Sequence, residues 1–197
     1  MPFAQKKSVR KFSYADYVSW PDDERWELID GVAYDMSPAP SVTHQKITGK
    51  FYILLSTHPE KKAECFVGIA PTDVVLSKHD VVQPDVFVVC DEKKITEANI
   101  QGAPDVVIEV LSPATALKDR REKKTLYERY GVKEYVLVDP VGQYVERLLL
   151  ADDGSYGRAE IYGPKDVFPL SVLEGIKISL WQVFEIEAPE GNTDSRE

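Results

Sequence analysis

The chain has 197 residues, of which 43% are hydrophobic and 29% are charged, a balance that is ordinary for a globular protein with one full-sized core. No apolar run approaches the roughly 20 residues of a membrane-spanning helix, and residues 1–11 lack the apolar stretch of a secretory signal, so we expect a cytoplasmic protein without a membrane partner. The 24 basic and 33 acidic residues give a formal net charge of −9, which argues against a strong general affinity for nucleic acid.

The first half of the chain predicts two helices and a series of short strands. Ser13 can cap a short helix that ends before Pro21, and residues 25–36 predict two strands around a turn at Gly31. In residues 43–57 apolar side chains recur at helical spacing, which predicts an amphipathic helix. Three short strands are then expected, at about 65–70, 73–76 and 85–90.

The second half predicts a strand–helix–strand unit followed by a hairpin. The run DVVIEV at 105–110 is almost wholly apolar, as is typical of a central strand buried on both faces. A helix over about 116–130, closed by Gly131, leads to a second buried strand at 134–139, and this order predicts a right-handed crossover and a parallel pair. The remaining elements are a hairpin of residues 143–150 and 156–162 and a short helix at about 180–185.

These elements predict an α/β fold in one domain. We expect the domain to span residues 1–197, with its core at about 12–185 and a polar tail at about 187–197.

The two cysteines are expected to be buried free thiols. Cys65 and Cys90 are 25 positions apart and do not form a CxxC pair. The three histidines do not cluster with them, so a structural zinc site is not expected.

A carboxylate inside the apolar strand at 105–110 is the first sign of chemistry. Burying Glu109 costs several kcal/mol unless a cation compensates it, although a glutamate at a strand end can also face solvent. Asp85 begins the strand at 85–90, and antiparallel pairing of the two strands would bring both carboxylates to one sheet edge. Oxygen ligands of this kind favour Mg²⁺, Mn²⁺ or Ca²⁺ over zinc.

The helix after Glu109 adds a cation. Stepping back by helical spacing from Tyr127, which lies on the buried stripe, gives Lys123 and then Asp119. Both side chains are therefore expected to face inward near Glu109. The alternative is a surface ion pair of Asp119 and Lys123, which would contribute only tenths of a kcal/mol.

Other polar residues are supporting candidates with ordinary alternatives. Glu27 alternates with Trp26 and Leu28 on a strand, where a charge commonly faces solvent. His44, at the start of a helix, is more often a capping or surface histidine than a base, and Gln83 precedes the strand of Asp85. The candidates for phosphate contact, which can also form a solvated face, are Lys118, Arg120, Arg121 and Lys124.

An ordered series of motifs resembles a known family. The motifs E-L-I-D-G, P-x-P-S-x-x-H, Q-P-D-V, P-D-V-V-I-E-V-L-S-P and D-x-x-x-K-x-x-x-Y-x-x-x-G-V-x-E-Y-x-L-V-D-P occur in this order across about 12–185. Together they are similar to the Uma-type family of restriction-endonuclease-like proteins, a branch of the PD-(D/E)XK nuclease superfamily.

The resemblance implies a restriction-endonuclease-like core, with a mixed central β-sheet flanked by helices. It implies that Asp85, Glu109 and the carbonyl of Val110 bind Mg²⁺ or Mn²⁺, and that Glu27 matches the acidic residue ahead of the core. It also implies that Lys123 acts as the superfamily's lysine. The usual lysine stands two residues after the glutamate, a position held here by Leu111.

The implied activity is metal-dependent hydrolysis of DNA phosphodiester bonds, and analogy to enzymes of this shape favours a homodimer. The alternative is a catalytically inactive module with a nuclease fold and a binding or regulatory role, which the charge of −9 favours. A hydrolase for another phosphate ester is a weaker alternative.

Overall fold

The computed structural model describes residues 10–21, 23–36, 39–58 and 65–190. Its central sheet has the strand order β11 (Glu160–Tyr162), β10 (Tyr144–Leu149), β9 (Glu134–Asp139), β8 (Val106–Val110), β6 (Val86–Val89) and β3 (Phe66–Ile69). β8 and β9 are parallel, and all other neighbours in this sheet are antiparallel. The predicted mixed sheet, the antiparallel pairing of β6 with β8 and the parallel pair are thus confirmed.

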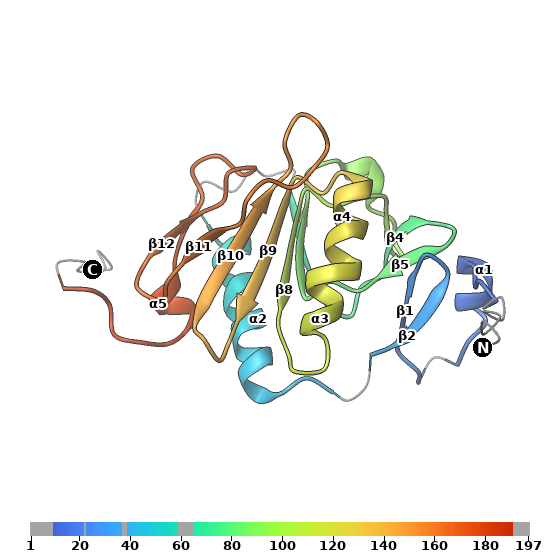
Figure 1. Cartoon of the computed structure of the whole chain (residues 1–197), viewed down its shortest axis with the longest axis horizontal. Helices are drawn as coiled ribbons and strands as arrows, with labels where there is room; N and C mark the ends of the chain where they lie inside the picture. The colour runs from blue at the N-terminus through green and yellow to red at the C-terminus, as the bar shows by residue number, and fades with distance from the viewer. Residues whose placement is uncertain (1–9, 22, 37–38, 59–64, 191–197) are drawn as a thin grey trace, which may run out of the picture.

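Helix α2 (Val42–Ser56) covers one face of this sheet (Figure 1). Its side chains Ile47, Phe51 and Leu55 are buried in one core cluster with Val86 and Ile108. The predicted amphipathic helix over about 43–57 is thus confirmed.

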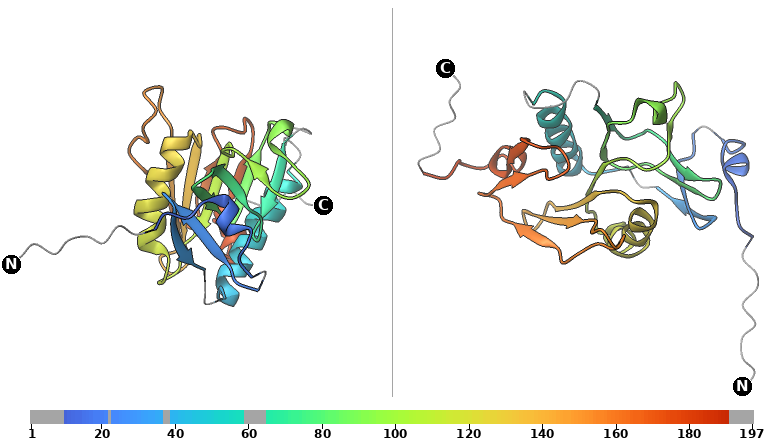
Figure 2. Two further views of the ribbon diagram at one scale, coloured as in Figure 1. Left: turned by 90° about the vertical axis from the view of Figure 1, so that its right-hand side faces the viewer. Right: turned by 90° about the horizontal axis from the view of Figure 1, so that it is seen from above.

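The opposite face is covered by a second helical segment, as the side view in Figure 2 shows. This segment joins α3 (Ala116–Lys118), a π-helical turn η2 (Asp119–Lys123) and α4 (Lys124–Tyr130). Leu126 and Tyr127 of α4 pack in a separate cluster with Phe87 and Val107, which alternate with the residues that face α2. Gly131 ends α4 with φ of 78°, a left-handed conformation that glycine adopts without steric cost.

A smaller five-stranded sheet stands beside the central one. Its order is β2 (Val32–Asp35), β1 (Trp26–Ile29), β5 (Asp80–Val82), β4 (Val74–Ser77) and β7 (Ile100–Gln101). The helix α1 (Tyr14–Tyr17) begins at the predicted cap Ser13, whose side chain accepts from the amide of Asp16. The remaining elements are a 3₁₀ turn, a two-stranded sheet and a last helix, at Glu92–Lys94 (η1), Val167–Pro169 (β12), Lys177–Ser179 (β13) and Leu180–Val183 (α5).

The prediction of free thiols is wrong, because Cys65 and Cys90 form a disulfide. They directly flank the paired residues Phe66 and Val89 of β3 and β6, so the strand register brings them opposite each other. Separation in the sequence did not reveal this cross-strand contact.

The structure describes only part of the two ends of the chain. Residues 187–190 form no helix or strand, whereas the rest of the predicted polar tail and residues 1–9 lie outside the described residues. No helix within the described ranges is long and apolar enough to cross a membrane.

Candidate active site

A cavity of about 1160 Å³ opens where the ends of β6 and β8 meet α2, η2 and the smaller sheet. It gathers most of the site residues predicted from the sequence. Those that line it are Glu27, His44, Gln83, Asp85, Glu109, Val110, Lys118, Asp119, Arg121 and Lys123.

Strand pairing brings Asp85 and Glu109 to the same sheet edge. Val86 of β6 pairs with Ile108 of β8, so the residue before Val86 faces the residue after Ile108. The Asp85 Oδ2 atom accepts a hydrogen bond of 2.8 Å from the amide of Val110, which fixes this carboxylate against the end of β8. The predicted convergence of the two acids therefore follows from the register alone.

Glu109 is almost completely buried, with 3% of its surface exposed. Its Oε1 atom accepts hydrogen bonds of 2.8 Å from Lys123 Nζ and 2.8 Å from the Tyr127 hydroxyl. Burial raises the pKa of Glu109 to about 8, against the opposing effect of Lys123, and the carboxylates of Asp119, Asp85 and Glu27 raise it further. The alternative of a solvent-facing glutamate is wrong.

Lys123 faces the site from the last position of the π turn η2. Asp119 and Lys123, at the two ends of this turn, are both buried, and the Lys123 ammonium lies 3.9 Å from Asp119 Oδ1. The same ammonium lies 2.7 Å from Glu27 Oε1. Burial lowers the pKa of Lys123, but Glu109, Glu27 and Asp119 outweigh it and hold that pKa well above its ordinary value. The lysine is therefore charged, and the alternative of a surface ion pair is wrong.

Glu27 is fully buried and connects the smaller sheet to the site. Its carboxylate lies 2.6 Å from Lys118 Nζ and accepts a hydrogen bond of 3.1 Å from the amide of Gln83. Burial raises the pKa of Glu27, yet the ammonium groups of Lys123 and Lys118 outweigh it and lower that pKa. Glu27 is thus an ionised carboxylate inside the protein, and the common reading as a solvent-facing charge is wrong.

His44 is buried and contacts the carboxylate of Asp85. Its Nε2 atom lies 3.1 Å from Asp85 Oδ2, and its Nδ1 atom lies 3.4 Å from the hydroxyl of Thr48. Burial lowers the pKa of His44, but the hydrogen bond and charge of Asp85 outweigh it, so the pKa is raised. The interpretation of His44 as a capping or surface histidine is therefore wrong, because its side chain is buried against Asp85.

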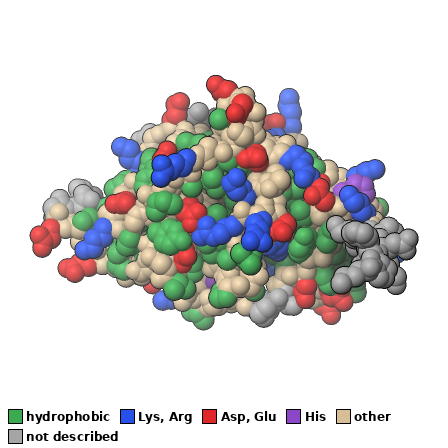
Figure 3. Space-filling model, viewed as in Figure 1, with side chains coloured by type: hydrophobic (Ala, Val, Ile, Leu, Met, Phe, Trp, Pro, Cys, Tyr) green, Lys and Arg blue, Asp and Glu red, His purple; other side chains and the backbone are tan. Residues whose placement is uncertain are grey.

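The four cations proposed for phosphate contact divide into two pairs. Lys118 and Arg121 line the cavity. Arg120 instead pairs with Glu146 at 2.7 Å, and Lys124 lies 3.9 Å from Glu128 and over the ring of Tyr156. On the face that carries α3 and α4, Lys and Arg side chains stand among Asp and Glu side chains rather than in one continuous basic patch (Figure 3).

Sequence reasoning missed two polar contacts of the site. Tyr127 was assigned only to the buried stripe, although its hydroxyl donates to Glu109. Its spacing of four residues from Lys123 was the available signal. Arg25, which donates to the side chain of Gln83 at 2.8 Å, carried no signal, because its partner is 58 positions away.

The donor set fits a hard divalent cation. Glu27, Glu109 and Asp119 lie against the ammonium of Lys123, Glu27 also lies against Lys118, and Asp85 contacts His44, so the four carboxylates outnumber their cationic partners. Burial is the main cause of the raised pKa of Glu109, and the neighbouring carboxylates add to it; a dication at the sheet edge would counter both effects. The described residues contain no group of three or more His, Cys, Asp or Glu side chains placed for a metal. The expected ligands are two such side chains and a main-chain carbonyl.

Comparison with known proteins agrees with this architecture. The chain is 28% identical over 150 residues to the uncharacterized protein slr1290 of Synechocystis sp., a match that covers 74% of this chain and 78% of that protein. The crystal structure of a "putative nuclease belonging to DUF820" from Anabaena variabilis superposes with a TM-score of 0.72 over 88% of this chain and 98% of that one, at 18% identity. This likeness establishes the predicted nuclease-type fold. A family model described as "putative restriction endonuclease" matches residues 14–181. The chain therefore belongs to this restriction endonuclease family, Uma2.

Proposed function

We propose that this protein is a divalent-metal-dependent endonuclease that hydrolyses phosphodiester bonds in DNA. The observation that carries the proposal is the convergence of Asp85 and Glu109 at one sheet edge, beside the charged ammonium of Lys123. Carboxylates with excess negative charge would hold Mg²⁺ or Mn²⁺, and a buried ammonium would meet the negative charge of a phosphate.

The metal ligands would be Asp85, Glu109 and the carbonyl of Val110. When bound, the ion would supply a Lewis acid for a phosphate oxygen and would lower the pKa of a coordinated water. His44 and Tyr127 hold the two carboxylates in place through their contacts with Asp85 and Glu109. Metal binding would also displace the proton that burial favours on Glu109.

The cations around the cavity would receive the substrate. Lys123 would stabilise charge that develops on the phosphate, because burial strengthens its electrostatic effect. Lys118 and Arg121 line the same cavity and would contact neighbouring phosphates. Glu27 holds both lysines, at 2.7 Å from Lys123 and 2.6 Å from Lys118, and would orient them toward the substrate.

The substrate and assembly follow from the same proposal. A net charge of −9 and scattered surface cations favour weak, salt-sensitive binding of DNA over tight non-specific binding. Analogy to enzymes of this shape, in which two active sites can cut two strands, leads us also to propose a homodimer. Sedimentation velocity would test this separately, and a monomer at high protein concentration would contradict it.

The activity is tested with supercoiled plasmid, branched duplex and single-stranded DNA, each with Mg²⁺, Mn²⁺ or EDTA. The wild type is compared with Asp85→Asn and Glu109→Gln. Glu185→Gln is the matched control, because it removes one negative charge from a surface ion pair with Lys46 and Lys50. We expect metal-dependent cleavage by the wild type and Glu185→Gln and none by the two site variants.

The outcomes separate the proposal from its alternative. Cleavage that persists in Asp85→Asn and Glu109→Gln would contradict the proposed site. Metal binding without cleavage of any of the three DNA forms would instead favour the catalytically inactive module.

A further inference from the structure

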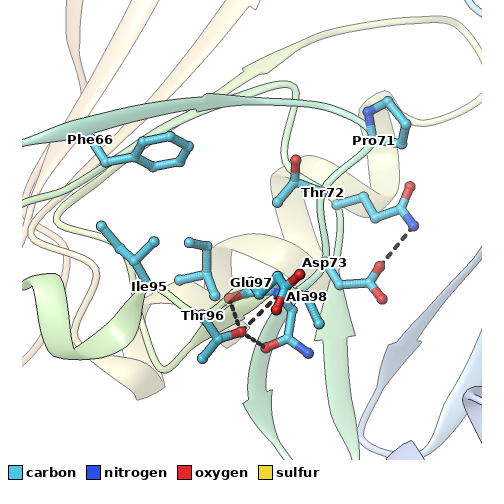
Figure 4. A pocket seen from close by; sticks show the side chains of 11 residues that line it. Phe66, Pro71, Thr72, Asp73, Ile95, Thr96, Glu97 and Ala98 are labelled. Carbon is cyan, nitrogen blue, oxygen red and sulfur yellow. Dashed lines mark hydrogen bonds between the residues drawn. The ribbon is translucent and has the colours of Figure 1, made fainter.

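A second cavity of about 410 Å³ adjoins the active site (Figure 4). It lies between Phe66 of β3, the residues that lead into β4, and the loop 95–100. Pro71 and Gln83 line both this cavity and the larger one, so the two share a wall. Its volume falls within the range of small-molecule sites, about 300–1000 Å³. Neither the family nor the proposed hydrolysis assigns it a ligand.

The shared wall is held by hydrogen bonds on both sides. The Gln83 Nε2 atom donates to Asp73 Oδ1 at 2.9 Å in the second cavity. Its Oε1 atom accepts from Arg25 at 2.8 Å, and its amide donates to Glu27 at 3.1 Å, both of which line the active-site cavity. A group in the second cavity would therefore lie next to a substrate in the first.

The second cavity offers acceptors and no cation. None of the residues that line it within the described chain is Lys, Arg or His, whereas Asp73 and Glu97 are carboxylates. Asp73 is fixed by two donors, the Tyr17 hydroxyl at 2.7 Å and Gln83, and a carboxylate has about four acceptor positions. The cavity thus disfavours phosphate and favours a group that presents N–H donors.

An apolar side complements these acceptors. Phe66 is 42% exposed, and in Figure 4 its ring lies across the cavity from Thr72 and Asp73, with Ile95 beside it. An exposed aromatic ring next to a hydrogen-bonding edge can hold a planar heterocycle by stacking.

We infer that this cavity receives an unpaired nucleobase of the bound DNA strand and favours the bases with an exocyclic amine, cytosine, adenine and guanine, over thymine. A carboxylate accepts from such an amine, whereas thymine has no exocyclic amine. The inference rests on the proposed function, because the neighbouring cavity would hold the phosphate of the same strand. It names the substrate as single-stranded or locally unpaired DNA, since a paired base cannot enter a cavity.

The first test uses nucleosides, which lack phosphate and so bind independently of the metal site. Deoxycytidine, deoxyadenosine and thymidine are titrated into the full chain in EDTA, and binding is followed by NMR. We expect tighter binding of deoxycytidine and deoxyadenosine than of thymidine, by roughly tenfold. We also expect the amide shifts to centre on residues 66, 73 and 95–100.

Three variants identify the groups that act. Asp73→Asn should remove the preference for amine-bearing bases. Phe66→Leu should weaken the binding of all three nucleosides by roughly tenfold. Glu97→Gln removes the same charge as Asp73→Asn from an exposed residue of the same cavity and should keep the preference. Circular dichroism checks that each variant is folded.

Several results would overturn the inference. Equal affinity of the wild type for thymidine and deoxycytidine would overturn it, whether or not the Asp73→Asn variant folds. Unchanged preference in a folded Asp73→Asn variant would also do so. Displacement of deoxycytidine by low concentrations of 1,4-diaminobutane would indicate a site for an organic cation instead. DNA cleavage is measured separately with metal, so a base preference without cleavage would contradict only the proposed function. Cleavage without a base preference would contradict only this inference.

Discussion

The ammonium of Lys123 lies 2.8 Å from Oε1 of Glu109, although the lysine belongs to a helical segment and the glutamate to a central strand. In the superfamily that the motifs resemble, the lysine follows the glutamate on the same strand, at the position held here by Leu111. Leu111 is buried in the core beside α4, so the π turn of the helix supplies the cation that the strand lacks.

Replacement of Lys123 by methionine should both destabilise the fold and abolish cleavage. It would leave Glu27 and Glu109 buried without their shared counter-charge, at a cost of about 3–5 kcal/mol in the free energy of unfolding. Chemical denaturation measures this change. Lys124→Met is the matched control and should change stability by no more than about 0.5 kcal/mol, since its partner Glu128 lies at 3.9 Å near the surface.

A double variant separates stability from catalysis. Glu27→Gln combined with Lys123→Met removes both charges of one buried pair and should recover part of the lost stability without restoring cleavage. If the loss of unfolding free energy in the double variant equalled the sum of the two single losses, Glu27 and Lys123 would not be energetically coupled, which would contradict the contact between them.

The stability of the metal-free protein should decrease as pH rises toward 8. Burial raises the pKa of Glu109 from 4.5 to about 8, so the folded state retains a proton in this window that the unfolded chain releases. By linkage, this contribution is complete below about pH 4.5 and is lost as pH passes through about 8. Burial also raises the pKa of Asp119, which acts in the same direction.

The comparison with Glu109→Gln isolates this effect, because glutamine keeps the shape of the protonated acid. In EDTA the melting temperature of the wild type should fall relative to that of the variant as pH rises from about 5 to about 9. A difference that is independent of pH, or that has the opposite sign, would show that Glu109 does not gain a proton on folding.

His44→Ala should weaken metal binding by roughly 10–100-fold, because Asp85 would lose the partner that fixes its carboxylate. Cleavage should return toward the wild-type rate at saturating metal. Thr48→Val is the control, since it removes the contact at Nδ1 and leaves the contact of Nε2 with Asp85. A rate that stays low at saturating metal would instead assign His44 a direct role in the chemical step.

The disulfide should stabilise the fold without taking part in the proposed reaction. Cys65 and Cys90 close a separation of 25 residues, so the double serine variant should lose about 3 kcal/mol in the free energy of unfolding. Below its melting temperature the variant should cleave DNA at the wild-type rate. Loss of cleavage in a folded double serine variant would show instead that the active site depends on the disulfide.

The sequence predicted the middle of the central sheet because β6, β8 and β9 lie in nearly continuous apolar runs. The strands near 85–90, 105–110 and 134–139 and the helix that ends at Gly131 were found from composition and caps. β5 and β7 were missed, since they have three and two residues and gain their stability from neighbours distant in the chain.

The site was predictable where one element carries the signal. Glu109 stood out as a charge inside an apolar strand, and the helical spacing indicated Lys123. The burial of Glu27 was not predictable, because its ion pair with Lys118 spans 91 positions. The π turn and the disulfide likewise depend on tertiary contacts that local patterns do not encode.

The binding of Mn²⁺ to the purified protein, measured by titration calorimetry near pH 8, tests the central claim most directly. We expect one Mn²⁺ site in the wild type and in Glu185→Gln. Binding should be strongly weakened in Asp85→Asn and in Glu109→Gln, and metal-dependent cleavage of DNA should follow the same order. Unchanged Mn²⁺ binding in both site variants would contradict the claim that Asp85 and Glu109 hold the catalytic metal.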